Sequence, residues 1–165
     1  MQVPKRKKEN WIRPKADPHI SQGKFDALER RLIQLKEVER PQMSIEVKRL
    51  AEMGDFSENA GYQLSKSKLR GINNKILKIE HHLKHAIIIE KTNTSTVQLG
   101  HTVTIEVNGK EKEYTIMGSA EVNLDRNTIS HNSPIGSALI GHEVGDEIDI
   151  KLKDRTLRCK ILDIT

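Results

Sequence analysis

GDFSEN, residues 54–59, separates two long segments that have the periodicity of amphipathic helices. Glycine suits the left-handed conformation that ends a helix, so Gly54 is expected to close the first segment. Asp55 is expected to cap the second helix, with Glu58 in its first turn. The same spacing would place both carboxylates on one side of the new helix, where they can present a metal-binding pair. Spacing alone leaves the cap and the metal pair as alternatives.

Apolar residues recur at intervals of three and four on both sides of this turn. In the first segment they are Phe25, Leu28, Leu32 and Leu35, followed by Met43, Val47 and Leu50. In the second they are Tyr62, Leu69, Ile72, Ile76, Ile79, Leu83 and Ala86. Two such seams joined by a tight turn predict an antiparallel coiled-coil hairpin over residues 21–91, with its tip at 54–59. Arms of about 30 residues would place the tip on the order of 45 Å from the base.

Pro41 interrupts the first seam, and the apolar repeat resumes one position late after it. Proline inside a helix removes a hydrogen bond and clashes with the preceding turn. A kink or a change of register is therefore expected near Arg40-Pro41.

The C-terminal part changes to a period of two after a polar linker, residues 92–98. Alternating residues around the hairpin signal Asn108-Gly109 predict two strands, and a third is expected near Thr128–His131. Ser133 and Pro134 are expected to cap and open a short helix that ends at Gly141. Two closing strands are expected at Glu147–Leu152 and Leu157–Ile164, around a turn at Lys153-Asp154-Arg155. The predicted fold is α+β, with a small antiparallel sheet domain and one short helix over residues 99–165.

Composition restricts the setting of the chain. The 165 residues are 31% charged and 3% aromatic, which disfavours a large central core. The single cysteine, Cys159, excludes an internal disulfide and fits a reducing, cytoplasmic environment. The longest apolar run, Ala86 to Ile89, is too short for a membrane span, so we expect neither secretion nor membrane insertion.

The net charge of +5 is unevenly distributed along the chain. Residues 1–20 hold six Lys or Arg against two acids, and three of the five prolines, which predicts a flexible basic arm that either contacts nucleic acid or is simply solvated. The second helical segment is also basic, and Glu80 is its only acid between Glu58 and Glu90. A one-sign face fits an anionic partner such as a phosphate backbone, or a merely soluble surface. His81 and His85 have helical spacing but no third ligand nearby, so no metal is expected there.

Two stretches of the sequence resemble the signatures of one known protein family. GDFSENAGYQLSKSKLRGI (residues 54–72) resembles the tip and second arm of the Gre transcript cleavage factors, the GreA/GreB family that binds bacterial RNA polymerase. ISHNSPIGSALIGHEVGDEI (residues 129–148) is similar to the second signature of the same family. Together the resemblance covers residues 21–165 and leaves out the basic arm. The second arm looks closer to GreB and the Asn-Ser-Pro-Ile stretch closer to GreA, so the subtype stays open.

The resemblance implies a function for the acidic tip. In this family the hairpin enters the secondary channel of the polymerase, where the positions of Asp55 and Glu58 help to hold the second Mg²⁺ of the polymerase active site. The factor is then no enzyme and has no cofactor of its own: it stimulates the polymerase to cleave backtracked nascent RNA. Two carboxylates suit this role, because Mg²⁺ keeps most of its waters and takes one or two carboxylates plus phosphates.

The resemblance also implies partners for the two halves. Lys66 and Arg70 are the candidates for contact with the extruded 3′ end of the RNA. The C-terminal domain is FKBP-like in this family and would dock on the polymerase near Asn132, Ser133 and Pro134. We expect a monomer that does not associate with membranes.

Two departures from the family pattern leave a second function open. Gly61 stands where the family commonly has an acid, and Glu121-Val122-Asn123 has an amide in place of the second carboxylate. A secondary-channel regulator that modulates or inhibits synthesis without cleavage therefore remains the alternative. A prolyl isomerase is disfavoured, because Tyr114 is the only aromatic residue in the C-terminal domain and cannot line an aromatic pocket.

Overall fold

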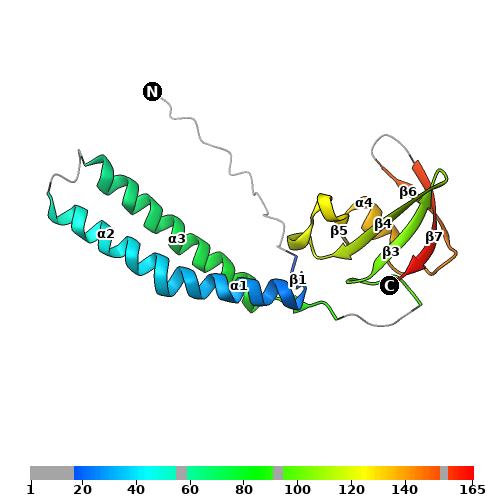
Figure 1. Cartoon of the computed structure of the whole chain (residues 1–165), viewed down its shortest axis with the longest axis horizontal. Helices are drawn as coiled ribbons and strands as arrows, with labels where there is room; N and C mark the ends of the chain where they lie inside the picture. Colours follow the sequence, from blue (N-terminus) through cyan, green and yellow to red (C-terminus); the bar gives the residue numbers. More distant parts are fainter. Residues whose placement is uncertain (1–16, 55–58, 91–94, 153–155) are drawn as a thin grey trace, which may run out of the picture.

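The computed structural model describes residues 17–54, 59–90, 95–152 and 156–165 (Figure 1). A helical hairpin is followed by a sheet domain, as predicted. The first arm consists of α1 (Gln22–Gln34), a π-helical turn η1 (Leu35–Glu39) and α2 (Arg40–Glu52). The second arm is α3 (Ala60–Lys84), whose 25 residues span about 37 Å.

The arms pack along the predicted seam. Leu35 from η1 is fully buried against Ile72 and Ile76 of α3, with Leu32 and Met43 packed beside them. Every seam residue named from the sequence is buried or half-buried, whereas the neighbouring apolar residues Ile33, Ile45, Leu64 and Leu77 are exposed. The coiled-coil hairpin is thus confirmed. Its buried stripe is narrow, which explains the low aromatic content of the chain.

The proline in the first arm is accommodated by a wider turn, without ending the helix. The π-helical turn Leu35–Glu39 lies directly before Arg40-Pro41, the first two residues of α2. A π turn inserts one residue into the helical repeat. This accounts for the seam resuming one position late, and it confirms the expected change of register.

The start of the second arm differs from the prediction. Gly54 has a φ of 79°, as expected of a residue that follows a helix. However, α3 begins at Ala60, and its cap is Asn59, whose side chain accepts a hydrogen bond from the backbone N–H of Tyr62 at 3.0 Å. The predicted cap, Asp55, was therefore four residues too early. Asparagine is as good a cap as aspartate, and a single sequence does not distinguish the two positions.

The base of the hairpin is closed by a short parallel sheet. Strand β1 (His19–Ile20) pairs with β2 (Ile87–Ile88), and Ile20 is fully buried. Residues 17–20, which the sequence analysis placed in the basic arm, thus belong to the folded part. Similarly, Val97 of the expected linker is fully buried in the core of the sheet domain.

The sheet domain contains five strands in the order β5-β4-β3-β7-β6. The strands are β3 (Thr102–Val107), β4 (Lys110–Met117), β5 (Thr128–Ser130), β6 (Glu147–Lys151) and β7 (Thr156–Ile164). Asn108 and Gly109 both have positive φ in the β3–β4 turn, as the Asn-Gly signal predicts. The pairs β3–β4, β3–β7 and β6–β7 are antiparallel, whereas β5 joins β4 in parallel, so the sheet is mixed.

A short helix, α4 (Pro134–Leu139), covers part of the core. Ser133 is its cap, and its hydroxyl accepts a hydrogen bond from the N–H of Gly136 at 3.0 Å. Leu139 is fully buried among Val103, Ile105 and Ile116. Two single 3₁₀ turns, η2 (Ser119–Glu121) and η3 (Leu124–Arg126), connect β4 to β5, and η2 contacts the segment at the hairpin base. The turn predicted at residues 153–155 lies outside the described residues.

The hairpin should depend on Leu35 far more than on its exposed neighbour. Leu35→Ala would leave a cavity in the only fully buried position of the described helical seam, so we expect a loss of about 2–5 kcal/mol in the free energy of unfolding of the hairpin. The matched control is Ile33→Ala, two residues earlier and 60% exposed. This substitution should change the free energy of unfolding by less than about 0.5 kcal/mol. Urea unfolding followed by far-ultraviolet circular dichroism measures both. Equal losses would contradict the assignment of the seam.

Candidate functional site

The two predicted tip carboxylates, Asp55 and Glu58, lie outside the described residues. The structure does describe the chain on both sides of them. Helix α2 ends at Glu52 and α3 begins at Ala60, and these two helix ends are the parts of the hairpin farthest from the sheet domain (Figure 1). In the sequence, the predicted pair lies between these two helix ends.

Lys66 and Arg70 are both exposed on α3 near that far end. Their spacing of four places them on the same side of the helix. The ammonium group of Lys66 lies 5.7 Å from the centre of the Tyr62 ring. Within the described ranges neither residue forms an ion pair, whereas Lys36 of the first arm pairs with Glu80 of α3 at 2.6 Å. Two cations are thus presented to solvent between the tip and the middle of the rod.

The three docking candidates follow strand β5. Asn132 and Pro134 are exposed, whereas Ser133 is half-buried and uses its hydroxyl to cap α4. The backbone N–H of Asn132 donates to the hydroxyl of Ser130 at 3.1 Å, which holds this segment against the sheet. Asn132 and Pro134 are therefore available to a partner, and Ser133 positions them.

A contact between the halves of the chain was not predicted from the sequence. The Glu121 carboxylate accepts hydrogen bonds from the backbone N–H of Ser21 at 2.7 Å and from its hydroxyl at 2.5 Å. Ser21 is also the cap of α1. Glu121 of the sheet domain thus holds the first residue of the hairpin. The neighbouring departure, Asn123, does not take part: its side chain caps the turn η3 locally.

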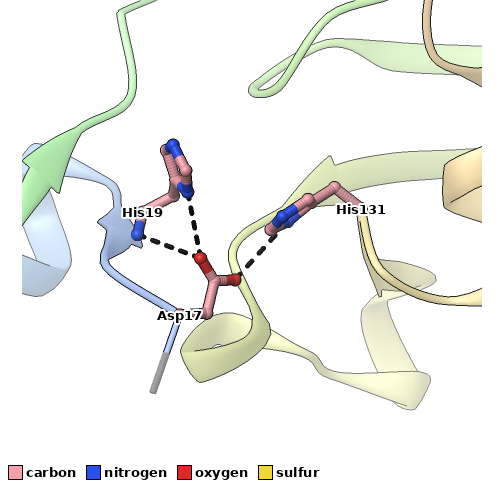
Figure 2. A group of neighbouring side chains, drawn as sticks. All are labelled: Asp17, His19 and His131. Carbon is pink, nitrogen blue, oxygen red and sulfur yellow. Dashed lines mark hydrogen bonds and ion pairs between the residues drawn. The ribbon is translucent and has the colours of Figure 1, made fainter. Parts of the chain in front are cut away.

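A second contact gathers three polar side chains at the same junction (Figure 2). Asp17 Oδ1 lies 3.0 Å from His19 Nδ1, and Asp17 Oδ2 lies 3.4 Å from His131 Nδ1. The backbone N–H of Ser119 donates to Asp17 Oδ2 at 2.6 Å. A Cβ atom on Gly118 would lie 1.8 Å from the His19 carbonyl oxygen, so only glycine permits this close approach of the two segments.

The Asp17 carboxyl is ionised in this setting. Its burial opposes ionisation, but the hydrogen bonds from Ser119 and His19 outweigh burial and hold the pKa of Asp17 well below its usual range. The sequence contains no signal for this cluster, because Asp17 and His19 precede the hairpin and His131 follows β5. Only the fold brings them together.

The sheet domain shows no aromatic-lined cavity among its described residues. Tyr114 packs at the edge of the domain core. A prolyl isomerase site thus finds no support. Separately, none of the described helices has the length and apolar character that a membrane span requires.

Solved structures that this chain matches include the transcription factor Gfh1, which is 25% identical, covers 90% of this chain and 97% of its own, and has a TM-score of 0.43. A prokaryotic transcription elongation factor GreA/GreB from Nitrosomonas europaea is also 25% identical, covers 74% of this chain and 95% of its own, and has a TM-score of 0.40.

Family models and curated relatives give a closer match. The model "Transcription elongation factor, N-terminal" matches residues 19–88, and "Transcription elongation factor, GreA/GreB, C-term" matches residues 91–165. Transcription elongation factor GreA of Macrococcus caseolyticus is 43% identical over 150 residues, covering 88% of this chain and 95% of that protein. GreA of Staphylococcus saprophyticus is 40% identical over 149 residues, covering 88% and 94%. The chain, from the start of the hairpin to the last strand, belongs to the GreA/GreB family of transcription elongation factors.

Proposed function

We propose that this protein binds RNA polymerase, inserts its hairpin into the secondary channel and stimulates the Mg²⁺-dependent cleavage of backtracked RNA by the polymerase. The observation that carries the proposal is the position of GDFSEN in the chain. It connects the ends of α2 and α3 that lie farthest from the sheet domain. A rod of about 37 Å whose acidic connection is at its far end is suited to carry carboxylates into a deep site.

The donor set at the tip fits a shared Mg²⁺ and not an independent site. Asp55 and Glu58 supply carboxylate oxygens, which Mg²⁺ prefers, but two carboxylates leave most of its six positions to water, phosphates and other protein groups. In phosphodiester hydrolysis by two metal ions, the ions activate the attacking water and stabilise the leaving oxygen. The contribution of this chain is to place two negative charges beside that reaction, so the factor itself is no nuclease.

The exposed cations of α3 supply a second contact. Lys66 and Arg70 lie within the first three helical turns of the arm, on one side of it. RNA displaced from the active site would run beside the hairpin, and its phosphates would be attracted to these groups. The exposed Asn132 and Pro134, in the sheet domain, are the proposed docking residues for the rim of the channel.

The alternative is a regulator that occupies the same channel without promoting cleavage. Gly61 lies in the first turn of α3, where the family commonly has an acid. This residue favours the regulator, because it leaves the tip with one negative charge fewer than the family pattern. A transcript cleavage assay on stalled complexes separates the two: a cleavage factor shortens the RNA, whereas the regulator slows synthesis and leaves the RNA length unchanged.

Neutralising the tip should abolish stimulation without preventing binding. For Asp55→Asn and Glu58→Gln we expect the rate of stimulated RNA cleavage to fall about 10- to 100-fold or more, because each removes a charged metal ligand. Affinity for the polymerase, measured by competition binding, should stay within about twofold, since docking uses other surfaces. The matched control is Glu52→Gln, whose exposed carboxylate ends α2 just before the tip. Unchanged cleavage by both tip variants would refute the proposal.

The RNA contact predicts a change in salt dependence. For Lys66→Gln and Arg70→Gln we expect a higher factor concentration for half-maximal cleavage, and a log–log salt slope that is shallower by about 0.7 for each phosphate that is no longer neutralised. Lys75→Gln and Lys78→Gln remove exposed charges nearer the base of the same helix and serve as controls. The titration is repeated at several salt concentrations. Equal effects of all four variants would point to general charge attraction and against a specific contact.

A further inference from the structure

We propose that Asp17, His19 and His131 form a binding site for a divalent transition-metal ion of the Zn²⁺ type, and that this ion joins the base of the hairpin to the sheet domain. One ligand atom from each residue lies within 4.8 Å of the other two. No other group of three such residues occurs in the described ranges. The proposal does not rest on the tip or on RNA cleavage, and it is tested without polymerase.

The ligand types and spacing suit such an ion. Two imidazoles and one carboxylate, with water in the fourth position, form a common tetrahedral ligand set. Bonds of 2.0–2.2 Å place tetrahedral ligand atoms about 3.4 Å apart. Here His19 Nδ1 lies 3.0 Å from Asp17 Oδ1, and His131 Nδ1 lies 3.4 Å from the other carboxylate oxygen, Oδ2. Small rotations of the side chains are enough to place a cation among the three.

The Asp17 carboxylate has hydrogen-bond donors but no Lys or Arg as counter-ion in the described part of the protein. Only 7% of the Asp17 side chain is exposed, and within that part its ion-pair partners are the two histidines, with no lysine or arginine. Hydrogen bonds from Ser119 and His19 stabilise the carboxylate, but no permanently charged cation balances it among the described residues. A divalent cation would supply the missing positive charge.

The two rings are already directed at the carboxylate (Figure 2). Without metal, His19 Nδ1 forms a hydrogen bond with Asp17, whereas His131 Nδ1 lies 3.4 Å both from Asp17 Oδ2 and from the carbonyl oxygen of Met117. On binding, the proton of a neutral imidazole moves from Nδ1 to Nε2 through solvent, so Nδ1 gains a free lone pair and no proton is lost overall. The two side chains are 33% and 17% exposed, which leaves solvent access for this exchange.

The ligands are also held in place by a second set of contacts. The N–H of Ser119 fixes Asp17 Oδ2 at 2.6 Å, and the pairing of β1 with β2 fixes the backbone of His19. Partners of this kind orient metal ligands and raise affinity. By comparison, the pairs His81–His85 and His142–Asp146 offer two ligands each within one local segment.

The position of the ion gives it a specific consequence. Asp17 and His19 lead directly into α1, whereas His131 directly precedes the docking candidates Asn132 and Pro134. A bound ion would therefore fix the direction of the hairpin relative to the segment proposed to dock on the polymerase. The same junction contains the Ser21–Glu121 hydrogen bonds, which the ion would reinforce.

The test measures Zn²⁺ binding to the untagged full-length chain in competition with a chromophoric chelator. We expect one equivalent per chain, and His19→Gln or His131→Gln should each weaken binding at least tenfold. His81→Gln and His142→Gln are the controls and should bind like the wild type. Zn²⁺ should raise the thermal midpoint of the wild type and of the controls but not of His131→Gln.

A measurement on the wild type keeps the test independent of variant folding. Addition of Zn²⁺ should shift the imidazole NMR signals of His19 and His131 and leave those of His81 and His85 in place. The proposal is overturned if the wild type takes up no Zn²⁺ against the chelator. It is equally overturned if the shifted signals, or the loss of affinity, belong to His81, His85 or His142.

Discussion

The narrow apolar contact between the two helical arms determines the length of the rod that they form. Leu35, Ile72 and Ile76 form the buried centre of that contact, and the half-buried residues above and below them extend it along the rod. A helix pair with so little buried surface is held by a continuous stripe and has no compact core. The stripe must therefore stay in register along the whole rod. The π-helical turn before Pro41 maintains it, because the extra residue returns Met43, Val47 and Leu50 to the side facing α3.

The base of the rod is built in a different way. Ser21 is held by Glu121, His19 by its close approach to Gly118, and Asp17 by Ser119. These are polar and backbone contacts, each made between the segment before α1 and the connection between β4 and β5. Together with the fully buried Ile20, they give the hairpin a defined attachment. For a factor whose two ends are proposed to act on the same large partner, the stiffness of this attachment matters as much as the length of the rod.

The hairpin and the sheet domain present different side chains, in agreement with the different functions proposed for them. In the sequence, two acids precede the exposed cations of α3, whereas the sheet domain presents Asn132 and Pro134 beside the capped start of α4. Lys66 and Arg70 are near the acidic connection in sequence, and both project from the side of the helix that is not buried. An arrangement of this kind can offer carboxylates to a metal ion and cations to a phosphate chain without bringing either group into the protein core.

The sequence by itself determined the helical seam, the register change at Pro41, the Asn-Gly turn and the cap of α4, because each of these depends on residues within a few positions of one another. It placed the cap of α3 too early, since Asp55 and Asn59 are equally suited to capping, and it placed residues 17–20 and Val97 outside the folded units. The tertiary structure alone decided the junction. Ser21 and Glu121 are separated by 100 residues, and Asp17 and Ser119 by 102. Periodicity records which face of a local segment is buried, whereas a single polar contact between distant segments leaves no repeated pattern in the chain.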